Sequence, residues 1–187
     1  MNEHVKLYPT IGVCGLDCGL CPRYYTVGPS RCPGCCGPEF FSSHPSCSFI
    51  TCCVKKKSLE VCAECSDSPC SKFKSDEKYQ QLKESSSYPS YKKVMSNLNF
   101  IKEHGIEQFI GQQKERIKLL ETMIADFDDG RSRSSYCKSA TSLDLTALES
   151  SLDKAIQKAK TDNIKPNDTK TKARILKGIL SGIALIS

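Results

Sequence analysis

The stretch that decides the fold is residues 14–70, which read CGLDCGLCPRYYTVGPSRCPGCCGPEFFSSHPSCSFITCCVKKKSLEVCAECSDSPC. Twelve of the thirteen cysteines of the chain lie in it, together with many prolines, glycines and serines and few large apolar side chains. Such a composition buries too little apolar surface to offset the entropy that is lost when the chain becomes ordered. We therefore expect either disulfides or bound metal to hold this stretch together.

The start of the chain indicates which of the two to expect. Residues 1–12 (MNEHVKLYPTIG) contain charges and a proline, but not the apolar segment of a secretory signal. We therefore expect a cytoplasmic, reducing environment, where clustered cysteines bind metal more often than they form disulfides. No run approaches the roughly 18 apolar residues of a membrane span, so no span is expected.

Charge gives little information about partners. The formal net charge is +6, and all of the excess lies in residues 71–187, because residues 1–70 balance six basic against six acidic side chains. Basic residues interleaved with aromatic ones, as in single-strand nucleic-acid binders, are absent from residues 14–70. The sequence thus carries no clear nucleic-acid signal. It leaves room for a protein partner and does not indicate the oligomeric state.

Ten cysteines recur at the spacing of metal ligands. A two-residue gap lets both sulfur atoms of a tight turn face one ion, and two such pairs complete a tetrahedron. One site could combine the pairs 18/21 and 32/35, and a second could combine 47/52 with 62/65 or with 65/70, but a cross-braced pairing fits equally well. The predicted metal ligands are Cys14, Cys18, Cys21, Cys32, Cys35, Cys47, Cys52, Cys62, Cys65 and Cys70.

The identity of the metal is less constrained than its ligands. Four thiolates suit zinc, iron or an iron–sulfur cluster. Several C-x2-C pairs in a cytoplasmic protein favour two structural zinc sites, while a count of ten ligands favours an iron–sulfur redox or anaerobic-enzyme component as the alternative. The spacing Cys14-x3-Cys18-x2-Cys21 also occurs in the radical-SAM cluster motif. The alternating strands and helices of that enzyme class do not follow here, so we discount it.

Three cysteines fall outside the ten. Cys36 and Cys53 adjoin predicted ligands, whereas Cys137 lies far along the chain beside Arg131 and Arg133. Guanidinium groups near a thiol favour its reactive thiolate and suit an anion. A second alternative is therefore a small-molecule enzyme that uses these three residues, against the hypothesis that residues 131–142 form an ordinary polar loop around a buried thiol.

Other catalytic signatures are missing from the sequence. It has no Ser/His/Asp order, no Walker loop and no GxGxxG, so catalytic and cofactor-binding residues cannot be assigned, and whether the chain is an enzyme stays open. Asp17, inside CGLDC, is expected to cap N–H groups of its own turn.

The pattern after residue 70 is helical. Apolar side chains at helical spacing predict helices over 91–104 and 106–127, a third with Thr146 and Glu149 as its capping box, and a last one capped at 168 or 169. We expect an α+β fold in which an irregular, metal-stapled module with short strands, one of them at 6–13, precedes a mostly helical half. The expected parts are a module at 1–70, a polar linker with a short helix at 71–90, and a bundle of about four helices at 91–187 that packs on the module.

The cysteine motifs also resemble a known family. CGLDCGLCP followed by YYT, then CPGC, CSFITC, VCAEC and PCSKF, is similar to an uncharacterised cysteine-rich family, a domain of unknown function widespread in archaea and anaerobic bacteria. The helical continuation NLNFIKEHGIEQFIGQQKERIKLL and the stretch DDGRSRSSYC look similar to its members as well, so the resemblance covers roughly residues 12–155. It implies metal binding, and it implies no activity, because none is assigned to the family.

Overall fold

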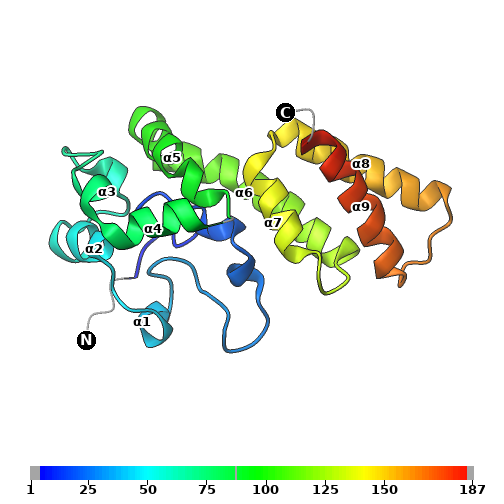
Figure 1. Ribbon diagram of the computed structural model, residues 1–187, viewed down its shortest axis with the longest axis horizontal. Coiled ribbons are helices and arrows are strands. Elements are labelled where there is room, and N and C mark those ends of the chain that lie inside the picture. Colours follow the sequence, from blue (N-terminus) through cyan, green and yellow to red (C-terminus); the bar gives the residue numbers. More distant parts are fainter. Residues whose placement is uncertain (1–4, 87, 185–187) are drawn as a thin grey trace. The chain divides into compact units, whose positions relative to one another are not determined.

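The structure is a computed structural model that describes residues 5–86 and 88–184 (Figure 1). The chain divides into two compact units, Met1–Gln113 and Lys114–Ser187. The boundary between the two units lies within helix α6 (Ile106–Phe127). Twelve of the thirteen cysteines therefore belong to the first unit.

The predicted α+β fold is wrong, because the described residues contain nine α-helices and, apart from one isolated antiparallel bridge, no paired strands. The expected strand at residues 6–13 does not form. Its backbone groups bond to separate parts of the chain: the N–H of Lys6 donates to the carbonyl of Cys36, and the N–H of Cys62 donates to the carbonyl of Val13. Since successive residues have different partner segments, no ladder develops.

The first unit is built from short helices at the cysteine-rich stretch and one long helix after it. They are α1 (Phe40–Ser43), α2 (Ser48–Ile50), α3 (Lys72–Ser75), α4 (Glu77–Ser85) and α5 (Ser90–His104). Helix α5 confirms the helix predicted over 91–104, and Gly105 caps its C-terminus. Residues 71–90, expected to hold one short helix, contain both α3 and α4.

Aromatic side chains join α3 and α4 to the cysteine-rich stretch. The ring of Phe49 lies 4.7 Å from that of Phe73 and 5.5 Å from that of Tyr79, and all three side chains are buried. Such edge and tilted contacts add to the burial of apolar area. This cluster belongs to one continuous core that also includes Val94 and Leu98 of α5.

Asp17 fixes the CGLDC motif to the two long helices. It is buried, and its carboxylate accepts hydrogen bonds from Nδ2 of Asn97 on α5 at 3.1 Å and from Nε2 of Gln113 on α6 at 2.8 Å. Its backbone N–H donates to Oγ of Ser90 at 2.8 Å. The expectation that this carboxylate caps N–H groups of its own turn is corrected by these side-chain partners. A buried carboxylate is stable only with such donors.

The second unit contains the end of α6 and the helices α7 (Arg133–Ser142), α8 (Leu145–Thr161) and α9 (Thr169–Ala184). Helices α8 and α9 pack side by side, drawn in orange and red in Figure 1. Residues 131–142 were expected as a polar loop, but most of them form α7. Its buried face is small and consists of Tyr136, Cys137, Ala140 and Thr141. Because these side chains are mixed in polarity, the sequence shows no clear apolar repeat at helical spacing.

The ends of the last helices test the predicted caps. Helix α8 begins at Leu145 after Asp144, so the predicted capping box of Thr146 and Glu149 does not start it. Helix α9 begins at Thr169, and Oδ1 of Asp168 accepts a hydrogen bond from the N–H of Thr171 at 3.0 Å, which confirms the predicted cap. Across the part of the chain that the structure describes, no helix combines the length and the apolar character needed to cross a membrane.

Candidate metal centre

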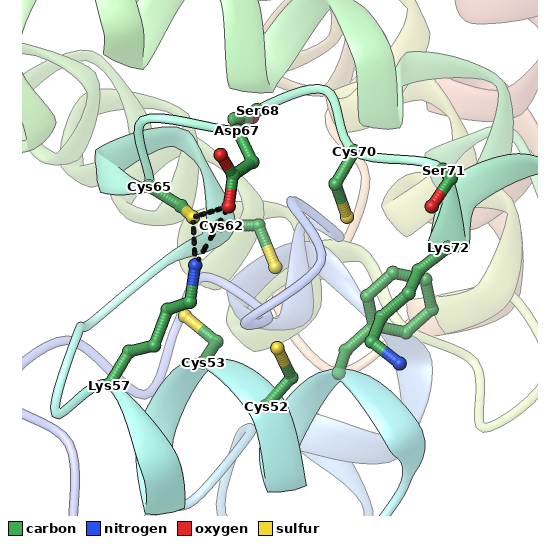
Figure 2. A pocket seen from close by; sticks show the side chains of 11 residues that line it. Cys52, Cys53, Lys57, Cys62, Cys65, Asp67, Ser68, Cys70, Ser71 and Lys72 are labelled. Atoms are coloured by element: carbon green, nitrogen blue, oxygen red, sulfur yellow. Dashed lines mark hydrogen bonds and ion pairs between the residues drawn. The ribbon is translucent and has the colours of Figure 1, made fainter.

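Five cysteines line one cavity of about 170 Å³ in the first unit (Figure 2). Figure 2 shows their sulfur atoms turned towards a common space, and we call this site the thiol pocket: Cys52, Cys53, Cys62, Cys65 and Cys70. Four of the five are predicted ligands. The ligand spacing in the sequence leaves out the fifth, Cys53. The adjacent pair Cys52-Cys53 is the sequence signal that could have identified it.

A continuous helical segment places the first two thiols of the pocket. Helix α2 runs into a wider π-helical turn at Thr51–Lys56, which carries Cys52 and Cys53. Cys47 caps the segment, and its Sγ accepts a hydrogen bond from the N–H of Ile50 at 3.5 Å. Single π-helical turns occur often at functional sites, because they shift side chains out of the usual helical register. Here the turn directs two adjacent cysteines to the pocket.

The pairs Cys18/Cys21 and Cys62/Cys65 share one backbone conformation. In each pair the N–H of the second cysteine donates to the carbonyl of the first, at 3.1 Å and 3.2 Å. The second cysteine has φ −78° and ψ 135° in both. These are the tight turns that a C-x2-C spacing predicts.

A lysine and three thiols set the electrostatics of the thiol pocket. Nζ of Lys57 lies 2.9 Å from Sγ of Cys65 and 3.0 Å from Oδ2 of Asp67, and these hydrogen bonds raise the pKa of Lys57. Lysine and carboxylate are both exposed, so their ion pair adds little to stability. Deeper in the pocket, a hydrogen bond between Cys62 and Cys53 lowers the thiol pKa of Cys53 and raises that of Cys62.

A second group of thiols gathers around the CGLDC motif, and we call it the N-terminal thiol group: Cys14, Cys18 and Cys35. Burial raises the pKa of the Cys14 thiol to about 12, and the charge of Cys35 adds to that effect. Burial likewise raises the pKa of Cys18 well above its usual range, and repulsion from the charges of Cys35 and Cys14 raises it further. In both cases burial of the thiol is the larger cause, and the charge of neighbouring thiolates adds to it.

Cys35 is the thiol of this group that most favours the charged form. The S–H of Cys36 donates to it and lowers its pKa to about 6, with further contributions from the charge of Lys6 and from the N–H of Val13. The Val13 nitrogen lies 3.5 Å from Sγ of Cys35. The same shared proton raises the pKa of Cys36. Cys36, which the ligand spacing leaves out, therefore acts as a donor beside a predicted ligand.

Backbone N–H groups point at several of the predicted ligands. Besides the bonds to Cys35 and Cys47, the N–H groups of Arg23 and Tyr24 lower the thiol pKa of Cys21, although burial raises it overall. Hydrogen bonds of this kind to sulfur stabilise thiolates around bound metal. Cys32 lies close enough to Cys21 for its charge to raise the same pKa. The predicted ligands thus fall into the thiol pocket, the N-terminal thiol group, the pair Cys21 and Cys32, and the capping Cys47.

The chemistry of these donors fits a soft cation, although their spacing does not define a coordination sphere. None of the cysteines in residues 14–70 forms a disulfide. In residues 5–86 and 88–184, no three His, Cys, Asp or Glu side chains are arranged closely enough to hold a metal ion. The thiols instead hydrogen-bond to one another and to Lys57. A bound cation would supply the charge that buried thiolates need.

The third candidate set lies in the second unit. Cys137 is completely buried on α7, which argues against a thiol that meets a substrate. Arg133 pairs with Asp128 across 3.4 Å, while Arg131 is exposed. The carboxylates of Asp128 and Asp129 accept hydrogen bonds from backbone N–H groups of the same loop. With carboxylates at its centre, this loop is a poor place for an anion.

Comparison of the chain with models of protein families, with curated proteins and with solved structures returned no match, so the inference of function rests on the residues themselves.

Proposed function

We propose that the chain is a metal-binding protein in which thiolates of residues 14–70 hold two ions, with zinc as the metal. One ion would be held in the thiol pocket, by four of Cys52, Cys53, Cys62, Cys65 and Cys70. The other would be held by Cys14, Cys18 and Cys35 with one more thiol of the same stretch. The role of both ions would be structural, since each ion would join segments that are separated in the sequence.

The observation that carries this proposal is the thiol pocket itself, with five sulfur atoms on a cavity of about 170 Å³. A donor set dominated by sulfur suits zinc, copper(I) and iron–sulfur clusters rather than magnesium or calcium. The exposed Asp67 is a carboxylate at the edge of this site.

Elemental analysis of protein purified without oxygen tests the proposal. We expect close to two equivalents of zinc per chain in a colourless protein. Cys62→Ser, which removes a thiol from the pocket, should lose one equivalent, while Cys137→Ala, which removes a thiol from the second unit, should keep both. Wild-type protein without bound metal, or equal loss in the two variants, would exclude the proposal.

An iron–sulfur cluster is the second candidate, and the size of the cavity favours it. A cluster contains several metal and sulfide atoms and therefore needs more room than one ion, and a fifth thiol is available beside the four that a cluster uses. Protein purified without oxygen would then be brown, absorb broadly near about 400 nm and contain iron and acid-labile sulfide. A colourless protein with stoichiometric zinc would exclude this candidate.

A further inference from the structure

Lys6 is a buried lysine among thiols. Its side chain is only 4% exposed, and Nζ donates a hydrogen bond to the carbonyl of Ile11 at 2.6 Å. Its backbone N–H donates to the carbonyl of Cys36 at 2.9 Å, which ties it to the turn that carries Cys35. Among residues 5–86 and 88–184, no Asp or Glu forms an ion pair with this ammonium.

A buried ammonium with a single carbonyl acceptor is costly, because one hydrogen bond does not replace the hydration of a charge. Lysines are rarely buried so completely unless a negative charge compensates them. The fold nevertheless holds Lys6 at this position through both its backbone and its side chain. A source of negative charge near Nζ would offset this cost.

Two kinds of group near Lys6 can supply that charge. The carboxylate of Glu60 accepts hydrogen bonds from the N–H groups of Leu7 and Tyr8, at 2.8 Å and 3.2 Å, but forms no ion pair with Nζ of Lys6.

The other groups are the neighbouring thiols. The backbone N–H of Lys6 donates to the carbonyl of Cys36, and the N–H of Val13, two residues after the acceptor Ile11, lies 3.5 Å from Sγ of Cys35. These contacts place Lys6 beside the turn that carries Cys35 and Cys36. Neutral thiols leave its charge uncompensated, whereas four thiolates around one divalent cation carry a net charge of −2.

We propose that Lys6 is the fixed counter-charge of a metal–thiolate centre formed by the N-terminal thiol group, and that it strengthens metal binding there through its charge. The proposal rests on the function proposed above, because it needs a cation bound by thiolates. Lys6 is a positioning and electrostatic residue in this scheme and does not ligate the metal. Its effect should resemble that of other outer-shell partners, whose removal lowers metal affinity roughly 10- to 100-fold.

Three substitutions separate charge from hydrogen bonding. Lys6→Met removes both, Lys6→Gln keeps a donor that can reach towards the carbonyl of Ile11, and Lys6→Arg keeps the charge. Lys56→Met is the control, since it removes an exposed lysine from the same unit. The measurement is zinc affinity of the full chain by competition with a chelator of known affinity, together with elemental analysis of the number of ions bound.

If Lys6 acts through its charge, Lys6→Met and Lys6→Gln should weaken one of the two zinc ions by a similar factor, roughly 10- to 100-fold. Lys56→Met and Lys6→Arg should bind as the wild type does. If Lys6 only holds the carbonyl of Ile11, Lys6→Gln should bind like the wild type while Lys6→Met is weakened, and this result overturns the proposal. Should Lys6→Arg fail to fold, the comparison of Gln with Met still decides.

The outcomes also distinguish this proposal from the function on which it rests. Wild-type protein that binds no metal removes the proposed function, and the role of Lys6 with it. Wild-type protein that binds two ions, with affinities that neither Lys6→Met nor Lys6→Gln changes, overturns the role of Lys6 alone.

Discussion

Nε2 of Gln113 donates a hydrogen bond to Oδ1 of Asp17 across 2.8 Å, and both side chains are buried. Asp17 belongs to the CGLDC motif, between two predicted metal ligands, and Gln113 lies on α6. Nε2 of Gln113 also donates to the carbonyl of Thr10 at 3.0 Å. The first turn of the cysteine-rich stretch is therefore held by a residue of α6 that follows Asp17 by 96 residues.

Loss of the Asp17 carboxylate should destabilise the first unit. Asp17→Ala leaves the buried side-chain amides of Asn97 and Gln113 without this acceptor, and hydrogen bonds to a charged group contribute about 1.5–3 kcal/mol each. We expect the free energy of unfolding to fall by about 3 kcal/mol, measured by urea unfolding of the metal-loaded protein. A fall below about 0.5 kcal/mol would contradict the view that this network holds the motif.

Gln113→Met should cost less than Asp17→Ala. It removes a donor to the carboxylate, but it also removes Oε1, a buried oxygen that has no hydrogen-bond partner. These effects oppose one another, so we expect a loss of about 1 kcal/mol in the same urea experiment. Gln112→Met is the matched control, because Gln112 is the exposed neighbour on α6, and its stability should equal that of the wild type.

The cap of α4 should make stability depend on acidity. Oδ1 of Asp76 accepts a hydrogen bond from the N–H of Tyr79 at 2.9 Å, and its carboxylate also accepts one from the hydroxyl of Ser48. The Ser48 bond, followed by the Tyr79 bond, lowers the pKa of Asp76 below its usual 3.8. A lowered pKa contributes stability that is present above pH 3.8 and is lost as the pH falls through the folded-state value.

Two substitutions at this cap separate charge from capping. Asp76→Asn keeps a good cap and should flatten the decline in stability below about pH 4, whereas Asp76→Ala should cost about 1 kcal/mol at pH 7 as well. Glu77→Gln, at the exposed next position, serves as the control for a lost carboxylate. Thermal unfolding followed by circular dichroism between pH 3 and pH 7 measures both effects. An Asn variant with the full acid sensitivity of the wild type would argue against this assignment.

Long amphipathic helices could be predicted from the sequence, and short elements of the cysteine-rich stretch could not. Helices α5 and α6 match the predicted spans because their apolar residues recur at helical spacing over many turns. The π-helical turn at Thr51–Lys56 is too short to show a period. A strand was expected at 6–13 because the apolar residues there suggest one, but strand formation depends on a partner that is distant in sequence.

The candidate site shows the same division between local and long-range information. The C-x2-C turns at Cys18/Cys21 and Cys62/Cys65 follow from local spacing. Local spacing does not predict which thiols share a cavity, because Cys52 and Cys70 line the same cavity only as a result of how the intervening chain folds. Lys6 was also beyond prediction, since nothing in its sequence neighbourhood shows that it is buried. Helix α7 could not be predicted from the polar stretch at 131–142, because only a narrow face of the helix, which includes Tyr136, is buried.

Bound metal should protect the predicted ligands from alkylation. A thiolate bound to a metal reacts slowly with iodoacetamide, whereas the exposed Cys47 and half-buried thiols such as Cys65 react once the metal is removed. We expect peptide mass spectrometry to show little labelling of residues 14–70 before chelation and extensive labelling afterwards. Cys137, which is completely buried in the second unit, serves as the internal control and should stay unlabelled in both samples. Equal labelling of residues 14–70 with and without chelator would contradict metal protection.

Close backbone contact at Gly34 should be necessary for the N-terminal thiol group. Gly34 and Gly28 have nearly the same backbone conformation, with φ of +87° and +91°. A Cβ atom on Gly34 would lie 2.3 Å from the carbonyl oxygen of Pro9, while a Cβ on Gly28 meets nothing within 4 Å. The same Pro9 carbonyl accepts a hydrogen bond from the N–H of Cys35 at 2.9 Å, so we expect relief of the clash to displace Cys35.

The two glycines thus form a matched pair that separates backbone strain from this contact. Gly28→Ala should cost only about 1–2 kcal/mol, because an alanine is strained in a left-handed conformation wherever it lies. Gly34→Ala should cost more than about 3 kcal/mol, because backbone atoms, unlike the end of a flexible side chain, cannot move aside cheaply. Elemental analysis should show that Gly34→Ala loses one metal equivalent and that Gly28→Ala keeps both. If both variants keep two equivalents, Cys35 is not a ligand, because its displacement would then have no effect on binding.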